Sequence, residues 1–116
     1  MAGLALAALQ LSFAGLYDLD SYFHARASLD LAKSGVQTEF PQAAFSTWAD
    51  AYSDKDFLFH ALTAPFVSES SLVSGGKWAI VFFDLVLFLA VAWTIRTLDL
   101  RFGALWLLLL VAASPY

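Results

Sequence analysis

The stretch WAIVFFDLVLFLAVAWTI, which runs from Trp78 to Ile95, decides the fold class of this chain. It holds one charged residue and carries tryptophans near both ends, where aromatic side chains meet the membrane interface. Lys77 and Arg96 flank it. A helix that crosses a bilayer needs about 20 predominantly apolar residues. The stretch therefore predicts a transmembrane helix over residues 78–95.

The composition of the whole chain agrees with a membrane protein. Its 116 residues are 60% hydrophobic and 14% charged, whereas soluble domains average about 45–50% and about 25%. The net charge of −4 argues against nucleic acid as a partner, because nucleic acid is bound by basic surfaces. The absence of cysteine excludes disulfides, zinc–thiolate sites and iron–sulfur clusters built from these residues.

Hydrophobic segments at both ends of the chain predict two further membrane helices. Residues 1–17 read MAGLALAALQLSFAGLY, without the basic start of a signal peptide, and residues 102–116 read FGALWLLLLVAASPY. We expect an all-α, polytopic integral membrane protein with about three membrane helices in a lipid bilayer. Because the last segment of about fifteen residues is short of a full span, we expect the chain to be a fragment of a longer membrane protein.

The charges of the connecting segments predict an orientation. The short connection 96–101, RTLDLR, carries two arginines and is expected in the cytoplasm. The long loop 18–77 then lies on the external side of the membrane, which we take to be a bacterial inner or plasma membrane. Its eight acidic residues outnumber its four basic ones, Arg26, Lys33, Lys55 and Lys77. An acidic external loop agrees with this topology.

The external loop is predicted to contain two amphipathic helices. The first spans residues 18–35, with Asp18 as its N-cap, Gly35 at its end and four apolar residues at helical spacing, Tyr22, Ala25, Leu29 and Ala32. The second spans residues 54–64, with Ser53 as its cap and Pro65 after its end. The following SESSLVSGG, residues 68–76, has the composition of a flexible linker.

The first of these helices begins with a cluster of polar residues. Asp18 and Asp20 suit a hard divalent cation such as Mg²⁺ or Mn²⁺, although acids at a helix N-terminus also stabilise the helix dipole without any ligand. His24 shares a helix face with Asp20 and is a candidate metal ligand or proton carrier. Arg26 can hold a phosphate or a carboxylate in a forked geometry, or pair with Asp30 one turn on.

A second polar group, Asp54, Asp56 and His60, is a weaker set of candidate metal ligands. If the loop folds back on itself, these residues can join Asp20 and His24 in a mixed carboxylate–imidazole site. The alternative is that the two acids cap a helix and that His60 is a buried structural residue.

The run DSYFHAR, residues 20–26, resembles the first acidic motif of the catalytic subunits of oligosaccharyltransferases. That motif places an Asp, an aromatic pair and an Arg in the first external loop after the first membrane helix. Asp20, Tyr22, Phe23 and Arg26 fill those positions here. The wider family is the GT-C superfamily of membrane glycosyltransferases, which use polyprenyl-phosphate-linked sugars. The resemblance implies that Asp20 binds a divalent metal and takes part in catalysis, with support from Asp18, and that Arg26 positions the phosphate or braces Asp20.

The function that this resemblance implies is the N-terminal part of a metal-assisted glycosyltransferase, with Asp20 and Arg26 as catalytic residues. The family has many more membrane helices and a second acidic motif, so missing helices of the same longer chain are expected as partners. From the residues alone, a non-catalytic small membrane protein or subunit with an acidic interaction loop stays open. A transporter fragment also stays open, with Asp84 binding an ion or proton, although Asp84 equally suits a hydrogen bond within a helix bundle.

Overall fold

The computed structural model describes residues 2–16 and 18–113, and in these ranges all regular secondary structure is helical. The α-helices are α1 (Ala2–Leu11), α2 (Leu19–Ser34), α3 (Phe57–Thr63), α4 (Leu72–Thr97) and α5 (Gly103–Ala113). Short 3₁₀ turns lie at Pro41–Ala43, Thr47–Ala49, Ala64–Phe66 and Glu69–Ser71. The expected all-α class is confirmed. The ends of the two terminal hydrophobic segments, residues 1, 17 and 114–116, lie outside the described residues.

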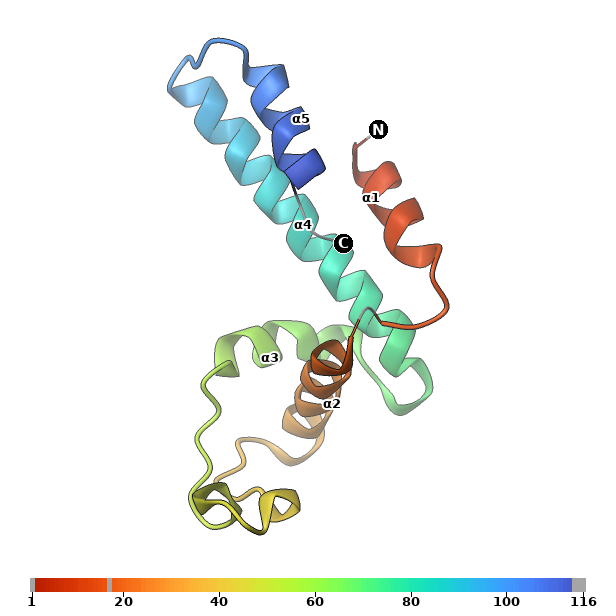
Figure 1. The fold of residues 1–116 in the computed structure, drawn as a ribbon, viewed down its shortest axis with the longest axis vertical. Coiled ribbons are helices and arrows are strands. Elements are labelled where there is room, and N and C mark those ends of the chain that lie inside the picture. The colour runs from red at the N-terminus through yellow and green to blue at the C-terminus, as the bar shows by residue number, and fades with distance from the viewer. Residues whose placement is uncertain (1, 17, 114–116) are drawn as a thin grey trace.

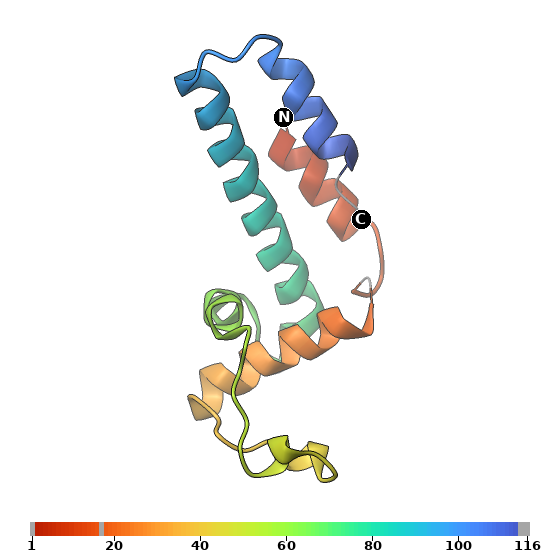
Figure 2. The ribbon, with the colours of Figure 1, turned by 60° about the vertical axis from the view of Figure 1, so that its left-hand side comes forward.

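The long helix α4 forms the axis of the molecule (Figure 1). The two shorter apolar helices, α1 and α5, each pack along α4 (Figure 2). Helices α2 and α3 lie crosswise at the N-terminal end of α4, and the rest of the loop hangs below them. The loop 18–71 and the connection 98–102 thus occupy opposite ends of α4, an arrangement that is compatible with the predicted orientation.

In the described part of the chain, one helix is long and apolar enough to cross a membrane. It is α4 together with the turn before it, Glu69–Thr97. Only 11% of its most apolar window is buried, and Phe82, Leu89 and Trp93 are exposed on it, which suits contact with lipid. Helices α1 and α5 have 10 and 11 residues, about half of a full span. A polytopic topology therefore stays a prediction.

The predicted limits of the first loop helix agree with α2. The Asp18 side chain caps the helix, since its Oδ1 accepts a hydrogen bond from the Ser21 amide at 2.7 Å. Gly35 ends the helix with a φ of +74°, which a residue with a Cβ rarely adopts. Ala25 and Leu29 are buried against Val67, with Leu16 and Leu72 packed around them. Of the other two residues predicted on this face, Tyr22 is half-exposed and Ala32 is exposed.

Replacing Asp18 with alanine should fray the first turn of α2, because the Ser21 amide loses its acceptor. The same hydrogen bond lowers the pKa of Asp18 below its ordinary value. The cap is therefore fully formed above the pKa of the unfolded chain and is lost as the pH falls through the lower pKa of the folded state. Hydrogen exchange of the Ser21 amide measures both the fraying in the variant and the loss of the cap at low pH. Unchanged protection in Asp18→Ala, with Asp50→Ala as the control, would contradict the capping role.

Two sequence predictions for the second half of the loop were wrong. Helix α3 begins at Phe57 and not at residue 54, and its N-cap is Asp56, without a side-chain cap bond, in place of Ser53. Instead, Asp54 Oδ1 accepts a hydrogen bond from the Asp56 amide at 3.0 Å. The predicted flexible linker 68–76 is a 3₁₀ turn followed by the first residues of α4. Packing overrides its serine- and glycine-rich composition, because Gly75 and Gly76 are buried there.

Candidate functional site

Asp20, His24, His60 and Asp54 form a continuous chain of polar contacts between α2 and α3. Asp20 Oδ2 lies 3.2 Å from His24 Nε2. The other ring nitrogen of His24, Nδ1, lies 2.8 Å from His60 Nε2. His60 Nδ1 in turn lies 2.6 Å from Asp54 Oδ2. Two imidazole rings are thus in direct contact, and each has a carboxylate on its outer nitrogen.

Local helix geometry and the return of the loop together build this cluster. Asp20 and His24 are four residues apart on α2 and therefore share a face, whereas His60 comes from α3 and Asp54 from the segment before it. The loop does fold back on itself, which is the condition under which Asp54, Asp56 and His60 were expected to join Asp20 and His24, but Asp56 does not take part in the contacts. His60 is fully buried and the His24 side chain is 23% exposed. The cluster thus runs from the surface into the interior.

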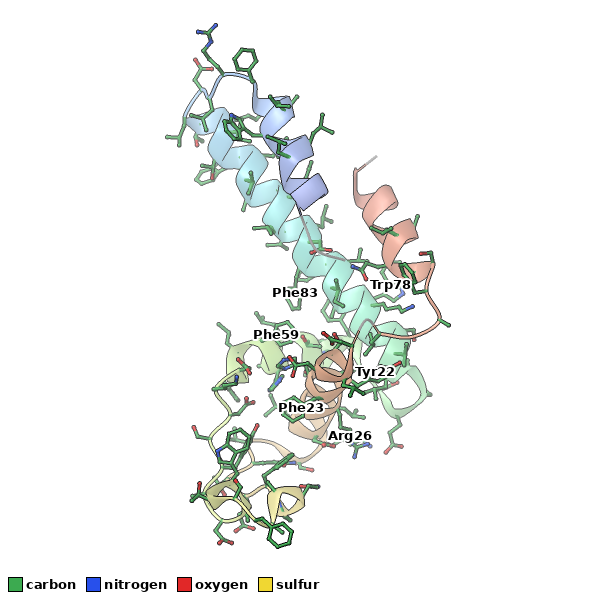
Figure 3. The ribbon with its side chains drawn as sticks, viewed as in Figure 1. Tyr22, Phe23, Arg26, Phe59, Trp78 and Phe83 are labelled. Atoms are coloured by element: carbon green, nitrogen blue, oxygen red, sulfur yellow. The ribbon has the colours of Figure 1, made fainter. Side chains whose placement is uncertain are left out.

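Aromatic rings enclose the two histidines. Phe23 meets both of them edge-on, with ring centroids 5.5 Å from His24 and 6.2 Å from His60. Phe59 meets His24 at 5.3 Å and also packs on Phe83 of α4 at 5.6 Å. Figure 3 shows Phe23 on α2, with Phe59 on α3 next to Phe83. These rings limit the access of water to the contact between the imidazoles.

An open cavity of about 300 Å³ adjoins the exposed end of the cluster. Its lining includes Asp20, His24, Asp54 and Asp56, together with Trp48 and Tyr52. A second cavity of about 190 Å³ lies beside it and shares Phe23, Tyr52 and Asp54 with it. Burial, with the nearby charges of Asp54 and Asp56, raises the pKa of Tyr52 above its ordinary value.

The remaining predicted site residues lie outside the four-residue chain. Asp18 is engaged as the cap of α2. Asp56 lines the larger cavity and has its carboxylate 3.8 Å from Lys55 Nζ. Arg26 pairs with Asp30 through contacts of 3.0 and 3.1 Å, which confirms that expected pairing, and lines the smaller cavity. Its predicted contact with Asp20 is not among the ion pairs of the described residues.

Asp84 is separate from the cluster. It lines a cavity of about 520 Å³ with residues of the segment after α1 and with Lys77. The buried Lys77 side chain donates a hydrogen bond to the Phe13 carbonyl. This bond ties the first turns of α4 to the end of the N-terminal segment, and the role of Asp84 stays a prediction.

The geometry has a consequence for metal binding. Within residues 2–16 and 18–113, no three His, Cys, Asp or Glu side chains converge as a metal-binding group. The reason is the order of the four contacting residues. The two carboxylates stand at the outer ends of this series of contacts, and the inner nitrogens of the two histidines face each other. A single metal ion held by all four residues therefore does not fit this arrangement. Asp20, whose side chain is 77% exposed, is open to a cation on its own.

Trp48 and Tyr52 are cavity residues that the sequence did not single out. They lie in the segment between α2 and α3, where Tyr52 stacks on Phe40 with centroids 5.3 Å apart and Trp48 meets Tyr52 edge-on at 5.7 Å. The sequence feature that could have pointed to them is the presence of two aromatic residues four positions apart in a polar loop. No protein-family model, curated protein or solved structure matches this chain.

Proposed function

We propose that this chain supplies the first external loop of a membrane glycosyltransferase, which moves a sugar or oligosaccharide from a polyprenyl-phosphate-type donor to an acceptor. The position of Asp20 carries the proposal. Helix α2 packs against the start of α4 through Ala25, Leu29 and Leu72. The exposed carboxylate of Asp20, near the start of α2, therefore lies close to the end of the helix that would span the membrane. That is the level at which the phosphate of a lipid-linked donor would stand.

Side chains at the start of α2 and at the two adjoining cavities suit the chemistry of such a donor. A divalent cation, Mg²⁺ or Mn²⁺, would offset negative charge on the phosphate leaving group when bound. Asp20 supplies the oxygen atoms that these ions prefer, and Asp18, two residues before it, has one carboxylate oxygen that is not engaged in capping α2. Arg26, at the smaller cavity, can bind a phosphate with its forked guanidinium group. The Tyr52 hydroxyl offers a hydrogen bond to a sugar or phosphate oxygen in the adjoining cavities.

The proposal includes the partners that the GT-C resemblance implies. These are the bilayer, the lipid-linked donor, further membrane helices of the same polypeptide and a second acidic motif. The loop 18–77 would face the external side of a bacterial inner or plasma membrane, where such donors are used.

The transfer reaction should depend on a divalent cation. In membrane vesicles that contain the full-length protein, label should pass from polyprenyl-phosphate-linked monosaccharides to acceptors that organic solvent does not extract. Treatment with EDTA should reduce this transfer, and Mn²⁺ or Mg²⁺ should restore it. Transfer that is insensitive to EDTA would overturn the metal-assisted mechanism, and absence of transfer from every donor tested would overturn the function.

One observation favours a second candidate, a non-catalytic membrane subunit with an acidic interaction loop. Asp20, His24, His60 and Asp54 contact one another, and the described residues hold no convergent metal-binding group. Under this alternative the cluster only holds α2 against α3, and Asp20 contributes nothing beyond its contact with His24. Purification of the protein from its native membrane with a stoichiometric partner, but without transfer activity, would favour this candidate.

A further inference from the structure

The open cavity of about 300 Å³ beside the polar cluster has aromatic walls. Trp48 and Tyr52 line it, and their rings meet at 5.7 Å between centroids with an angle of 72° between the ring planes. Two planes at such an angle form a concave corner. Phe40 supports one of these walls, because it stacks on Tyr52 with ring centroids 5.3 Å apart. Phe23 adds a third aromatic ring to the lining.

The lining of the same cavity is rich in negative charge. Among the described residues it holds three aspartates against one lysine and one histidine, which are Asp20, Asp54, Asp56, Lys55 and His24. The Lys55 side chain is 84% exposed and its ammonium group lies 3.8 Å from the Asp56 carboxylate. Water screens an exposed pair of this kind, so the lysine offsets little of the negative charge. The cavity should therefore attract cations and repel anions.

We propose that this cavity binds an organic cation of the alkylammonium class, such as the trimethylammonium group of choline. The faces of aromatic rings attract cations, tryptophan most strongly, and aromatic cages are the known surroundings of quaternary ammonium groups. A metal ion gains nothing from such walls, since aromatic rings supply no ligand atoms, and the described residues contain no convergent metal-binding group. The combination of an aromatic corner with carboxylates thus selects a cation that has an apolar surface.

The size of the cavity limits the ligand to a small group. Pockets for small molecules range from about 300 to 1,000 Å³, and this cavity lies at the lower end of that range. A choline group fits this limit, whether it is a free solute or the headgroup of a phospholipid. The inference concerns the ring faces of Trp48 and Tyr52, which the proposed sugar transfer does not use. It holds whether or not the chain transfers sugar.

Saturation-transfer NMR tests the proposal directly. The protein is purified in a maltoside detergent, which has no aromatic protons, and EDTA is added so that no divalent cation occupies Asp20. Choline chloride then replaces sodium chloride at constant ionic strength. Irradiation of the aromatic protons of the protein should transfer saturation to the choline methyl groups, and the effect should saturate with concentration. The uncharged carbon analogue of choline, in which a tert-butyl group replaces the trimethylammonium group, should bind at least about fivefold more weakly.

Two substitutions separate the aromatic contribution from the charge. Trp48→Ala should weaken choline binding at least about fivefold, whereas Tyr52→Phe, which keeps the ring, should stay within about twofold of the wild type. Asp56→Asn should also weaken binding, because it removes a carboxylate from the lining. Asp50→Asn removes an exposed carboxylate of the same loop that does not line the cavity, and it should bind choline as the wild type does.

The source of the ligand is determined in nanodiscs. A shift of the Trp48 indole N–H signal in phosphatidylcholine discs relative to phosphatidylglycerol discs, without free choline, would assign the ligand to a lipid headgroup. A shift that appears only when choline is added would assign it to a soluble cation. Absence of saturable transfer to choline would overturn the proposal. Equal binding of the uncharged analogue, or undiminished binding by Trp48→Ala, would overturn it as well.

Discussion

Under the proposed glycosyltransferase function, replacing Asp20 with alanine should lower the rate of sugar transfer by the full-length protein by at least about 100-fold, without loss of expression. Loss of a residue that only orients a metal ligand typically costs about 10–100-fold in metal affinity or activity. Loss of a carboxylate that itself holds the cation beside a phosphate leaving group should reduce activity by at least the upper end of that range. The fold should survive, because the Asp20 side chain is 77% exposed and, among the residues that the structure describes, its ion-pair contact is with His24.

The control for this prediction is Asp50→Ala, which removes an exposed carboxylate from the same loop. Its transfer rate should match that of the wild type, and the circular dichroism spectra of both variants should show the same helix content. Asp20→Ala with activity near that of the wild type would remove Asp20 from the catalytic site. It would leave the interaction-loop candidate as the better account of the cluster.

The features that the sequence predicted well are those that neighbouring residues determine. Asp18 caps α2 and Gly35 ends it because each acts on the backbone within a few positions. The ion pair of Arg26 with Asp30 follows from helical spacing in the same way. The long apolar helix follows from hydropathy alone. In each case the physical cause lies within one helix and can be read without knowing the fold.

The contact between His24 and His60 is of another kind. The two residues are 36 positions apart, and their meeting depends on the path of the segment between α2 and α3. That path is set by packing and backbone contacts, such as the hydrogen bond from the Tyr52 amide to the Thr38 carbonyl at 2.8 Å. The sequence predicted that these residues could meet only if the loop folds back on itself. The metal and catalytic roles of its residues stay predictions.

The start of α4 shows why the composition of residues 68–76 led to the wrong prediction of a flexible linker. Glycine and serine favour flexible linkers in isolation, but here the absence of a side chain permits close packing between α4 and the turn at residues 64–66. A Cβ added at Gly75 would overlap the carbonyl oxygen of Phe66 and lie 2.8 Å from its carbon and 3.0 Å from Val67 Cα. The glycine is therefore a packing residue, and the helix continues through it.

Gly75→Ala should destabilise the protein by about 3 kcal/mol or more. The free-energy cost of overpacking is at the upper end of its usual range when backbone atoms have to move. The new methyl group would force α4 away from the turn after α3. This displacement would also disturb Val67, which packs in the core with Ala25 and Leu29. We expect a clear fall in Tm in detergent micelles, followed by circular dichroism, and faster hydrogen exchange in α3 and in the turn at residues 64–66.

Gly76→Ala provides a matched comparison one residue further along the same helix. A Cβ there would lie 3.3 and 3.6 Å from the two methyl groups of Leu16 and 3.7 Å from Ala25 Cβ, and the Leu16 side chain can yield by a small rotation. Alanine also favours a helix over glycine by about 1 kcal/mol, which offsets the crowding. The stability of Gly76→Ala should therefore stay within about 1 kcal/mol of the wild type. Equal stability of the two variants would show that α4 is not packed against the Phe66 carbonyl.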